Sequence, residues 1–182
     1  MKNKLKILIA LVLFLGIIFA LISEGRQIGF NIGYEPQQPI NFSHKIHAGE
    51  NKIKCLYCHY AAEKGRHAGI PSTEVCLNCH TKIKTDSTEI QKVKEALESG
   101  KQIEWKKVHH FPDFAYFNHS QHVKVGKVAC QECHGPVETM TRLKQQNNLN
   151  MGWCLECHRK NKIAAPENHK SRAGGDCARC HY

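Results

Sequence analysis

The chain has 182 residues, a length that normally corresponds to a single domain. Its formal net charge of +10 is in the range of nucleic-acid-binding proteins. All ten of its cysteines, however, belong to five copies of the pattern Cys-x-x-Cys-His, and this indicates a different chemistry.

The first 22 residues combine a basic start with an apolar run. Lysines occupy positions 2, 4 and 6, and no charged residue occurs from Ile7 to Ile22. This pattern fits a Sec export signal, and it is also close to the lower limit of about 17 residues for a membrane-spanning helix. No clear cleavage site follows, so we expect an uncleaved anchor over residues 1–22, with a cleaved signal as the alternative. Because positive residues stay cytoplasmic, the rest of the chain is expected on the periplasmic, extracytoplasmic side of the cytoplasmic (inner) membrane.

Residues 23–41 are expected to form a linker, because they contain several glycines and prolines. The linker leads to the part of the chain that holds the five motifs, residues 42–182, which we expect to be one domain.

Each Cys-x-x-Cys-His motif is an attachment signature for c-type haem. The two thiols add to the vinyl groups of the porphyrin, and the adjacent histidine ligates the iron from the proximal side. Disulfides and zinc ribbons are the alternatives, and three of the four gaps between motifs are close to the zinc-ribbon spacing. Neither alternative explains a histidine after every second cysteine. We therefore expect five haem c groups, with thioether bonds to Cys55, Cys58, Cys76, Cys79, Cys130, Cys133, Cys154, Cys157, Cys177 and Cys180, and proximal ligands His59, His80, His134, His158 and His181.

Residues 42–182 offer about 28 residues per haem, too few to build an ordinary hydrophobic core. The haems themselves are therefore expected to form the core of a small domain of mainly α-helical and irregular structure. Each haem also carries two propionates, which offset the net charge of +10, so we exclude nucleic acid as a partner.

Residues 42–59 and 117–134 repeat one pattern without a gap. A phenylalanine and two histidines precede the first and the third motif at the same spacing. The matched positions are Phe42 and Phe117, His44 and His119, and His47 and His122. A second motif follows each copy, so we expect two repeat units, 42–80 and 117–158, and a fifth haem at 177–181.

One clear helix is predicted between the two units, over residues 89–99. Thr88 and Gln91 form a capping-box pattern at its start, and Gly100 can end it. Its apolar positions, Ile90, Val93 and Leu97, fall on one face. Segments 135–152 and 159–176 are expected to be loops.

Eight histidines lie outside the motifs, more than five irons could use as distal ligands. His44, His47, His119 and His122 are the preferred candidates, because they occur twice at the same place before a motif. One of His109 and His110 is expected as the fifth, with His67 and His169 as further candidates and Met140 or Met151 as alternatives for a single His/Met haem. Two histidines on every iron would leave no open position for a substrate, which favours electron transfer over catalysis.

The Phe-x-His-x-x-His element before a Cys-x-x-Cys-His motif resembles the class III, c3/c7-like multihaem cytochromes. This resemblance implies two c7-like units in which the first histidine ligates the haem of the next motif and the second reaches a later haem. It assigns His44 to the haem at His59, His47 to the haem at His80, His119 to the haem at His134 and His122 to the haem at His158. The haem at His181 would take His109, His110 or His169.

Four longer strings, at 39–49, 67–72, 108–123 and 151–159, resemble the pentahaem subunit of alternative complex III. That resemblance implies a membrane-anchored electron-transfer subunit of a quinol-oxidising respiratory complex. It also implies molybdopterin/iron–sulfur-like and polytopic membrane subunits as partners, and a periplasmic cytochrome or an oxidase as electron acceptor. The string from Val108 to Asp113 favours His109 over His110 as a ligand.

Two other functions compete with this interpretation. A stand-alone periplasmic carrier that feeds a terminal reductase would have the same motifs. A nitrite- or hydroxylamine-type enzyme would need an iron with an open sixth position, and none of the five motifs departs from the pattern. We therefore expect an electron-transfer subunit that is not itself an enzyme, with quinol oxidation in another subunit.

Overall fold

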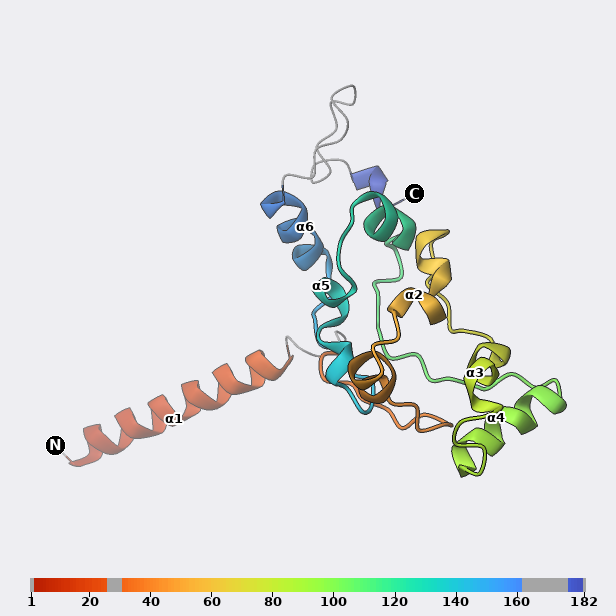
Figure 1. The fold of residues 1–182 in the computed structure, drawn as a ribbon. Coiled ribbons are helices and arrows are strands. Elements are labelled where there is room, and N and C mark those ends of the chain that lie inside the picture. Colours follow the sequence, from red (N-terminus) through yellow and green to blue (C-terminus); the bar gives the residue numbers. More distant parts are fainter. Residues whose placement is uncertain (1, 26–30, 162–176, 182) are drawn as a thin grey trace, which may run out of the picture.

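The computed structural model describes residues 2–25, 31–161 and 177–181. Short helices joined by irregular segments make up this part of the chain, and it contains no strand (Figure 1). The expectation of a mainly helical and irregular fold is therefore confirmed.

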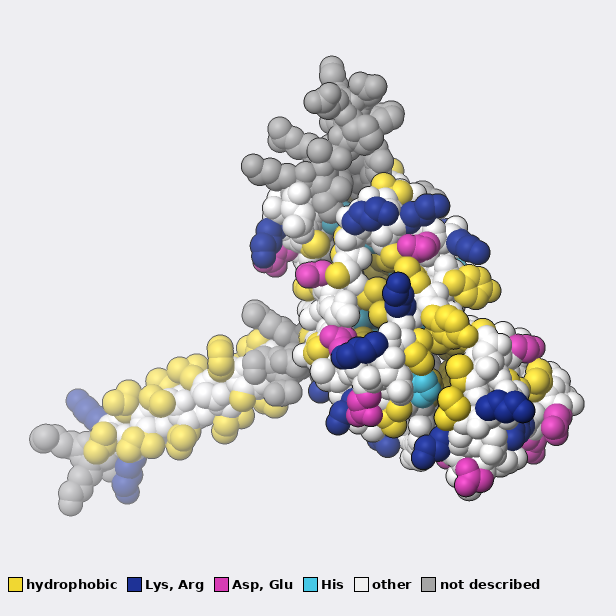
Figure 2. All heavy atoms as spheres, viewed as in Figure 1, with side chains coloured by type: hydrophobic (Ala, Val, Ile, Leu, Met, Phe, Trp, Pro, Cys, Tyr) yellow, Lys and Arg dark blue, Asp and Glu magenta, His cyan; other side chains and the backbone are white. Residues whose placement is uncertain are grey.

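The N-terminal helix α1, Lys2–Gly25, stands apart from the rest of the described residues, and beyond the lysines at its start the face seen in Figure 2 is covered by apolar side chains. Its stretch Lys4–Ile22 has 19 residues, none of them buried. At about 1.5 Å per residue, this stretch spans roughly the 30 Å of a bilayer core. Length and composition thus meet the requirement for a membrane-spanning helix, and an export signal meets the same requirement.

Three of the five motifs lie wholly in short helices; the first ends one residue beyond its helix, and the fifth begins in a 3₁₀ turn. The helices are α2 Cys55–Cys58, α3 Thr73–His80, α5 Cys130–His134 and α6 Met151–Lys160, and the turn is η5 Cys177–Arg179. Side chains three and four positions apart share a helix face. A helical Cys-x-x-Cys-His therefore presents both sulfurs and the imidazole on the same side.

Two π-helical segments contain the Phe-x-His-x-x-His elements. They are η1, Lys45–Glu50, and η3, Gln121–Val125. Each follows the first histidine of its element and contains the second. Single π turns of this kind are rare overall, but those that occur are often found at functional sites.

Helix α4, Thr88–Glu98, agrees with the predicted helix except at its start. Ser87, in extended conformation, is the N-cap, so the expectation that Thr88 caps the helix was wrong. Gln91 does not reach back to close a capping box, because its amide donates to the carbonyl of Thr85. At the other end Gly100 has φ +66 and stops the helix as expected.

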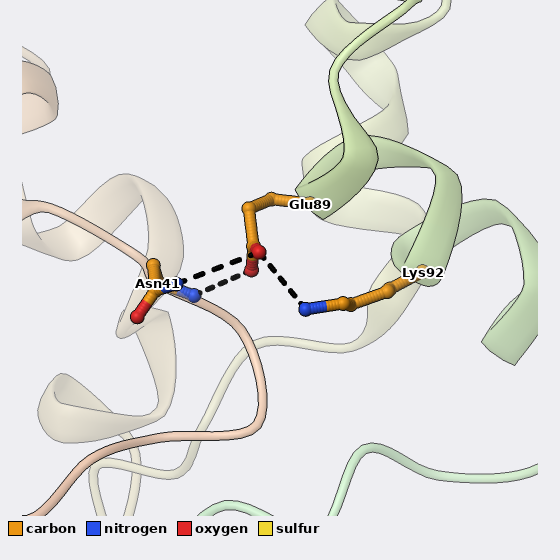
Figure 3. Close-up of polar contacts among 3 residues, drawn as sticks. All are labelled: Asn41, Glu89 and Lys92. Atoms are coloured by element: carbon orange, nitrogen blue, oxygen red, sulfur yellow. Dashed lines mark hydrogen bonds and ion pairs between the residues drawn. The ribbon is translucent and has the colours of Figure 1, made fainter.

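Helix α4 packs on α3 and is tied to the chain just before the first ligand element. Ile90 and Val93 are buried, whereas Leu97 is exposed. The Glu89 carboxylate accepts from the backbone amide of Asn41 at 2.7 Å and from the Lys92 ammonium at 2.9 Å (Figure 3). These contacts hold the start of the haem-binding part of the chain against α4.

Residues 31–41, the second half of the expected linker, lie against the rest of the molecule. The amide of Gly33 donates to the carbonyl of Gln145 at 2.8 Å, and the amide of Gln145 donates to the carbonyl of Tyr34 at 3.1 Å. Gln38 exchanges two hydrogen bonds with the backbone of Lys106. This half of the linker is therefore part of the folded body.

Gln145 is the most deeply buried side chain of the described residues. Its oxygen accepts from the amide of His110 at 2.7 Å, and its nitrogen donates to the carbonyl of Asn147 at 3.0 Å. The Gln145 side chain and backbone thus join three chain segments that are far apart in sequence.

The apolar core of the described residues is small. Its members are Ile40, Ala62, Ile90, Val93, Val108 and Met140. A chain of this length normally needs a larger buried apolar area to fold. This fits the expectation that large apolar cofactors complete the interior.

Two short 3₁₀ helices complete the described elements, η2 Tyr60–Glu63 and η4 Val137–Thr139. Helix η4 packs against η1, with the amide of Lys45 donating to the carbonyl of Met140 at 2.9 Å. The segment 135–152, expected to be a loop, therefore contains η4 and the start of α6, and residues 162–176 of the other expected loop lie outside the described residues.

Candidate haem-ligand sites

The two Phe-x-His-x-x-His elements have the same local geometry. In the first, the ring of Phe42 lies edge-on to His44 at 4.9 Å and stacks on His47 at 4.3 Å. In the second, the ring of Phe117 lies edge-on to His119 at 4.8 Å and stacks on His122 at 4.3 Å. Lys52 and Lys127, which are 75 residues apart like the histidines, both have positive φ, +56 and +53. The sequence repeat is therefore also a repeat of backbone and ring arrangement.

Three histidines of these elements face the histidine of a motif. The ring centroids of His47 and His80 are 6.0 Å apart, those of His119 and His134 are 6.4 Å apart, and those of His122 and His158 are 6.0 Å apart. Metal–imidazole bonds are about 2 Å long, so two imidazoles on opposite sides of one metal ion have ring centres about 6 Å apart. The spacing of all three pairs therefore fits two axial ligands of one iron.

In most of these imidazoles, Nδ1 forms a hydrogen bond with a backbone carbonyl. Since a carbonyl can only accept, Nδ1 donates this hydrogen bond, which leaves Nε2 as the nitrogen that can ligate a metal. Such an outer hydrogen bond orients a metal-ligating imidazole and raises its basicity. The Nδ1-to-carbonyl pairs are His47–Ser43 at 2.8 Å, His59–Gly69 at 2.8 Å, His80–Ile83 at 2.9 Å, His119–Arg66 at 2.8 Å, His122–Asn118 at 2.8 Å and His181–Phe114 at 2.6 Å.

The middle of the molecule brings together histidines of both elements and both following motifs. Burial, and after it the neighbouring His109, His119, His59 and His44, lower the pKa of His134 to about 3. Burial likewise lowers the pKa of His44 to about 4, with His59 as the next cause. A neutral imidazole is the form that ligates iron. The Nδ1 of His44 is buried and has no hydrogen-bond partner among the described residues.

The five motifs are neighbours in an order that differs from the sequence. Motifs 1 and 2 meet where the Asn78 amide donates to the Tyr57 hydroxyl at 3.0 Å. In the other neighbouring motifs, the cysteines lie close enough to affect each other's thiol pKa. Burial raises the pKa of Cys130, with Cys55 as the next cause; burial raises that of Cys133 to about 11, with Cys157 next; and burial raises that of Cys154, with Cys180 next. The spatial order is therefore motif 2, 1, 3, 4 and 5.

His109 lies on the outer side of His134. The Nδ1 of His134 is 3.1 Å from the Nε2 of His109, and their rings are perpendicular. His109 thus stands where a backbone carbonyl stands for the other histidines. His109 was one candidate for the distal ligand of the haem at His181. The Nδ1 of His181 contacts the carbonyl of Phe114.

The remaining candidates differ in their surroundings. His67 and His110 are exposed, and His169 lies outside the described residues. Met140 is buried next to η4, and Met151 is exposed at the start of α6.

The residues that orient the ligands were not predicted from the sequence. Carbonyls of Arg66 and Gly69 bind His119 and His59, but a backbone carbonyl leaves no mark in a sequence. The nearest signal is the 67–72 string that carries the resemblance noted above. The buried Gln145 was missed because a lone glutamine is normally exposed.

The comparisons with known proteins agree with this arrangement. Residues 115–182 match the family model of cytochrome c7 and related cytochrome c. This region contains the second ligand element and the last three motifs. This part of the chain is similar to the c7-like cytochromes, in agreement with the cytochrome expected from the ligand elements and with haem c as the cofactor.

A curated relative matches a larger part. The chain is 34% identical over 122 residues, 66% of its length, to the menaquinone reductase, multiheme cytochrome c subunit, of Nitratidesulfovibrio vulgaris Hildenborough. The chain spans 57% of the length of that relative.

Proposed function

We propose that this protein is a membrane-anchored pentahaem c-type cytochrome that transfers electrons as a subunit of a respiratory quinone oxidoreductase complex. The observation that carries the proposal is the spacing of the histidine pairs. In three pairs from separate parts of the chain, the distance between the ring centroids fits one iron bound between the two imidazoles. An iron with both axial positions filled exchanges electrons and does not bind a substrate.

Five haems are proposed, one for each motif. The ten motif cysteines would hold them by thioether bonds, and the five motif histidines would be the proximal ligands. His44, His47, His119 and His122 are proposed as distal ligands of the haems at His59, His80, His134 and His158. The fifth distal ligand is open between His109, His110 and His169. A bound haem supplies an iron that accepts and releases one electron at a time.

The domain organisation follows from the same assignment. Residues 1–22 would be the membrane anchor, with the haem domain 42–182 on the periplasmic side. Within that domain, 42–80 and 117–158 would each hold two haems and 177–181 the fifth. The apolar α1 and the short connection after it support an anchor, and cleavage after export is the alternative.

The two similarities favour opposite directions of electron flow. The relative is a subunit of a menaquinone reductase, which favours delivery of electrons to a quinone in the membrane. The resemblance to alternative complex III favours the opposite direction, from quinol to a periplasmic cytochrome or oxidase. In both cases the quinone site belongs to another subunit, and molybdopterin/iron–sulfur-like and polytopic membrane subunits are the expected partners.

Two measurements test this proposal. A pyridine haemochrome titration against protein concentration should give a haem-to-protein ratio near five, with mostly low-spin ferric signals in electron paramagnetic resonance. A ratio below four, or a dominant high-spin iron that binds nitrite, would contradict it. Extraction in mild detergent should then bring down further subunits. Purification of the anchored cytochrome alone in every detergent would instead favour the stand-alone carrier.

The direction can be measured on the same preparation. The complex is mixed either with a reduced periplasmic-type cytochrome and a menaquinone analogue, or with the quinol and the oxidised cytochrome. Faster turnover in the first mixture supports a quinone reductase, and faster turnover in the second supports a quinol oxidase.

A further inference from the structure

The loop of residues 65–69 lies between η2 and α3. Its backbone contacts two of the proposed iron ligands. The carbonyl of Gly69 accepts from Nδ1 of His59 at 2.8 Å. The carbonyl of Arg66 accepts from Nδ1 of His119 at 2.8 Å. His59 belongs to the first motif, and His119 belongs to the second ligand element, 60 residues later.

The contact with His119 is part of a docking of the loop onto the second ligand element. The Arg66 carbonyl also accepts from the His119 amide at 3.2 Å, and the Gly65 carbonyl accepts from the Ser120 amide at 3.0 Å. The Arg66 guanidinium lies 4.9 Å from the centre of the Tyr116 ring, on the same segment. The loop is thus fixed to residues 116–120 by side chain and backbone.

The conformation of the loop depends on Gly69. This residue has φ +72, a left-handed conformation that other residues rarely adopt. A Cβ at this position would meet only the Ala61 side chain, at 4.0 Å. A larger residue at position 69 would therefore act through backbone strain and the direction of the peptide, and not through a clash.

We propose that the 65–69 loop positions His59 and His119 together, so that one backbone segment sets the electronic properties of two haems held by different repeat units. A hydrogen bond from Nδ1 to a carbonyl raises the basicity of the imidazole, which stabilises ferric iron. Weakening both bonds raises the midpoint potentials of both haems. Arg66 and Gly69 are positioning residues and do not touch the iron. The inference rests on the proposed haem ligation.

The test is Gly69→Ala in the full-length protein, read out on the haems and not by turnover. The haem methyl signals in nuclear magnetic resonance and the midpoint potentials are compared with wild type. The signals are assigned with His44→Ala and His119→Ala, each of which marks one haem. We expect the haems at His59 and His134 to shift, with higher potentials, and the other three to stay unchanged.

Two further variants complete the design. Gly65→Ala is the matched control, because position 65 has no positive φ and no atom within 4 Å of an added Cβ; it should shift no haem. Gly69→Asn should shift the same two haems by less, since asparagine tolerates positive φ better than alanine.

The outcomes separate this inference from the proposed function. The pyridine haemochrome ratio reports haem binding by itself, and it should stay near five in every variant. A shift of only one haem, or of none, would overturn the joint positioning. Loss of haem from Gly69→Asn while Gly65→Ala keeps five would also overturn it, because the loop would then be a folding element.

Discussion

The imidazole rings of His119 and His134 have centroids 6.4 Å apart and are parallel to within 3°. The Nδ1 of His119 donates to the carbonyl of Arg66, and the Nδ1 of His134 lies next to Nε2 of His109. The two inner nitrogens therefore face each other across the space of one metal ion. No other described pair has rings so nearly parallel.

This pair leads to the first prediction. His119→Ala should convert one of the proposed haems from low spin to high spin, because its iron would lose the proposed distal ligand. Electron paramagnetic resonance of the oxidised protein measures the change. Lys124→Ala, an exposed change on η3, is the control and should leave all irons low-spin. An unchanged spectrum for His119→Ala would reject the pairing.

His109→Gln tests the role of His109. A glutamine oxygen can accept a hydrogen bond from Nδ1 of His134, which lies 3.1 Å from Nε2 of His109, but glutamine is a poor iron ligand. We expect every haem to stay low-spin in this variant. A new high-spin signal from one haem would make His109 the fifth distal ligand.

Gly49→Ala should destabilise the contact between η1 and η4. An added Cβ would overlap the backbone carbonyl of Glu138, and backbone cannot move aside as a flexible side chain can. Overpacking of this kind costs about 1–3 kcal/mol. Thermal unfolding followed by circular dichroism should show a lower midpoint than for Gly65→Ala, which meets no neighbour. Equal midpoints would show that η1 and η4 are not in contact in solution.

The Asn41–Glu89–Lys92 contact predicts a pH dependence. The hydrogen bond from Lys92, and next that from the Asn41 amide, lower the pKa of the Glu89 carboxyl below its ordinary value of 4.5. A lowered pKa in the folded state adds stability above the ordinary pKa, and this stability is lost as the pH falls through the lowered value. Glu89→Gln should therefore reduce the stability by about 0.5 kcal/mol at pH 7, as for other exposed ion pairs, and by less near pH 3.

The matched control for this change is Glu95→Gln on the exposed side of α4. It removes the same charge from the same helix without touching Asn41 or Lys92. If both variants lose equal stability at pH 7, the contact drawn in Figure 3 contributes nothing beyond net charge.

Much of this arrangement could be predicted from the sequence, because it depends on side-chain types at fixed spacing. The Cys-x-x-Cys-His copies marked the haem-attachment motifs, and the repeat predicted that His47 and His122 would occupy equivalent places. The start of α4 was misplaced by one residue, since Ser87 and Thr88 are both good caps and only the backbone decides between them. The spatial order of the motifs depends on long-range packing, and the ligand-orienting carbonyls of Arg66 and Gly69 carry no residue type of their own.

The docking of residues 31–41 onto the folded body leaves little chain between α1 and that body. Six residue steps separate Gly25, where α1 ends, from Asn31, where the described body begins. Six residue steps of about 3.5 Å allow a reach of roughly 20 Å. If α1 stays in the membrane, the body is confined to a thin shell at the bilayer surface. A soluble electron partner must then come to that surface, whereas a partner embedded beside the anchor is always within range.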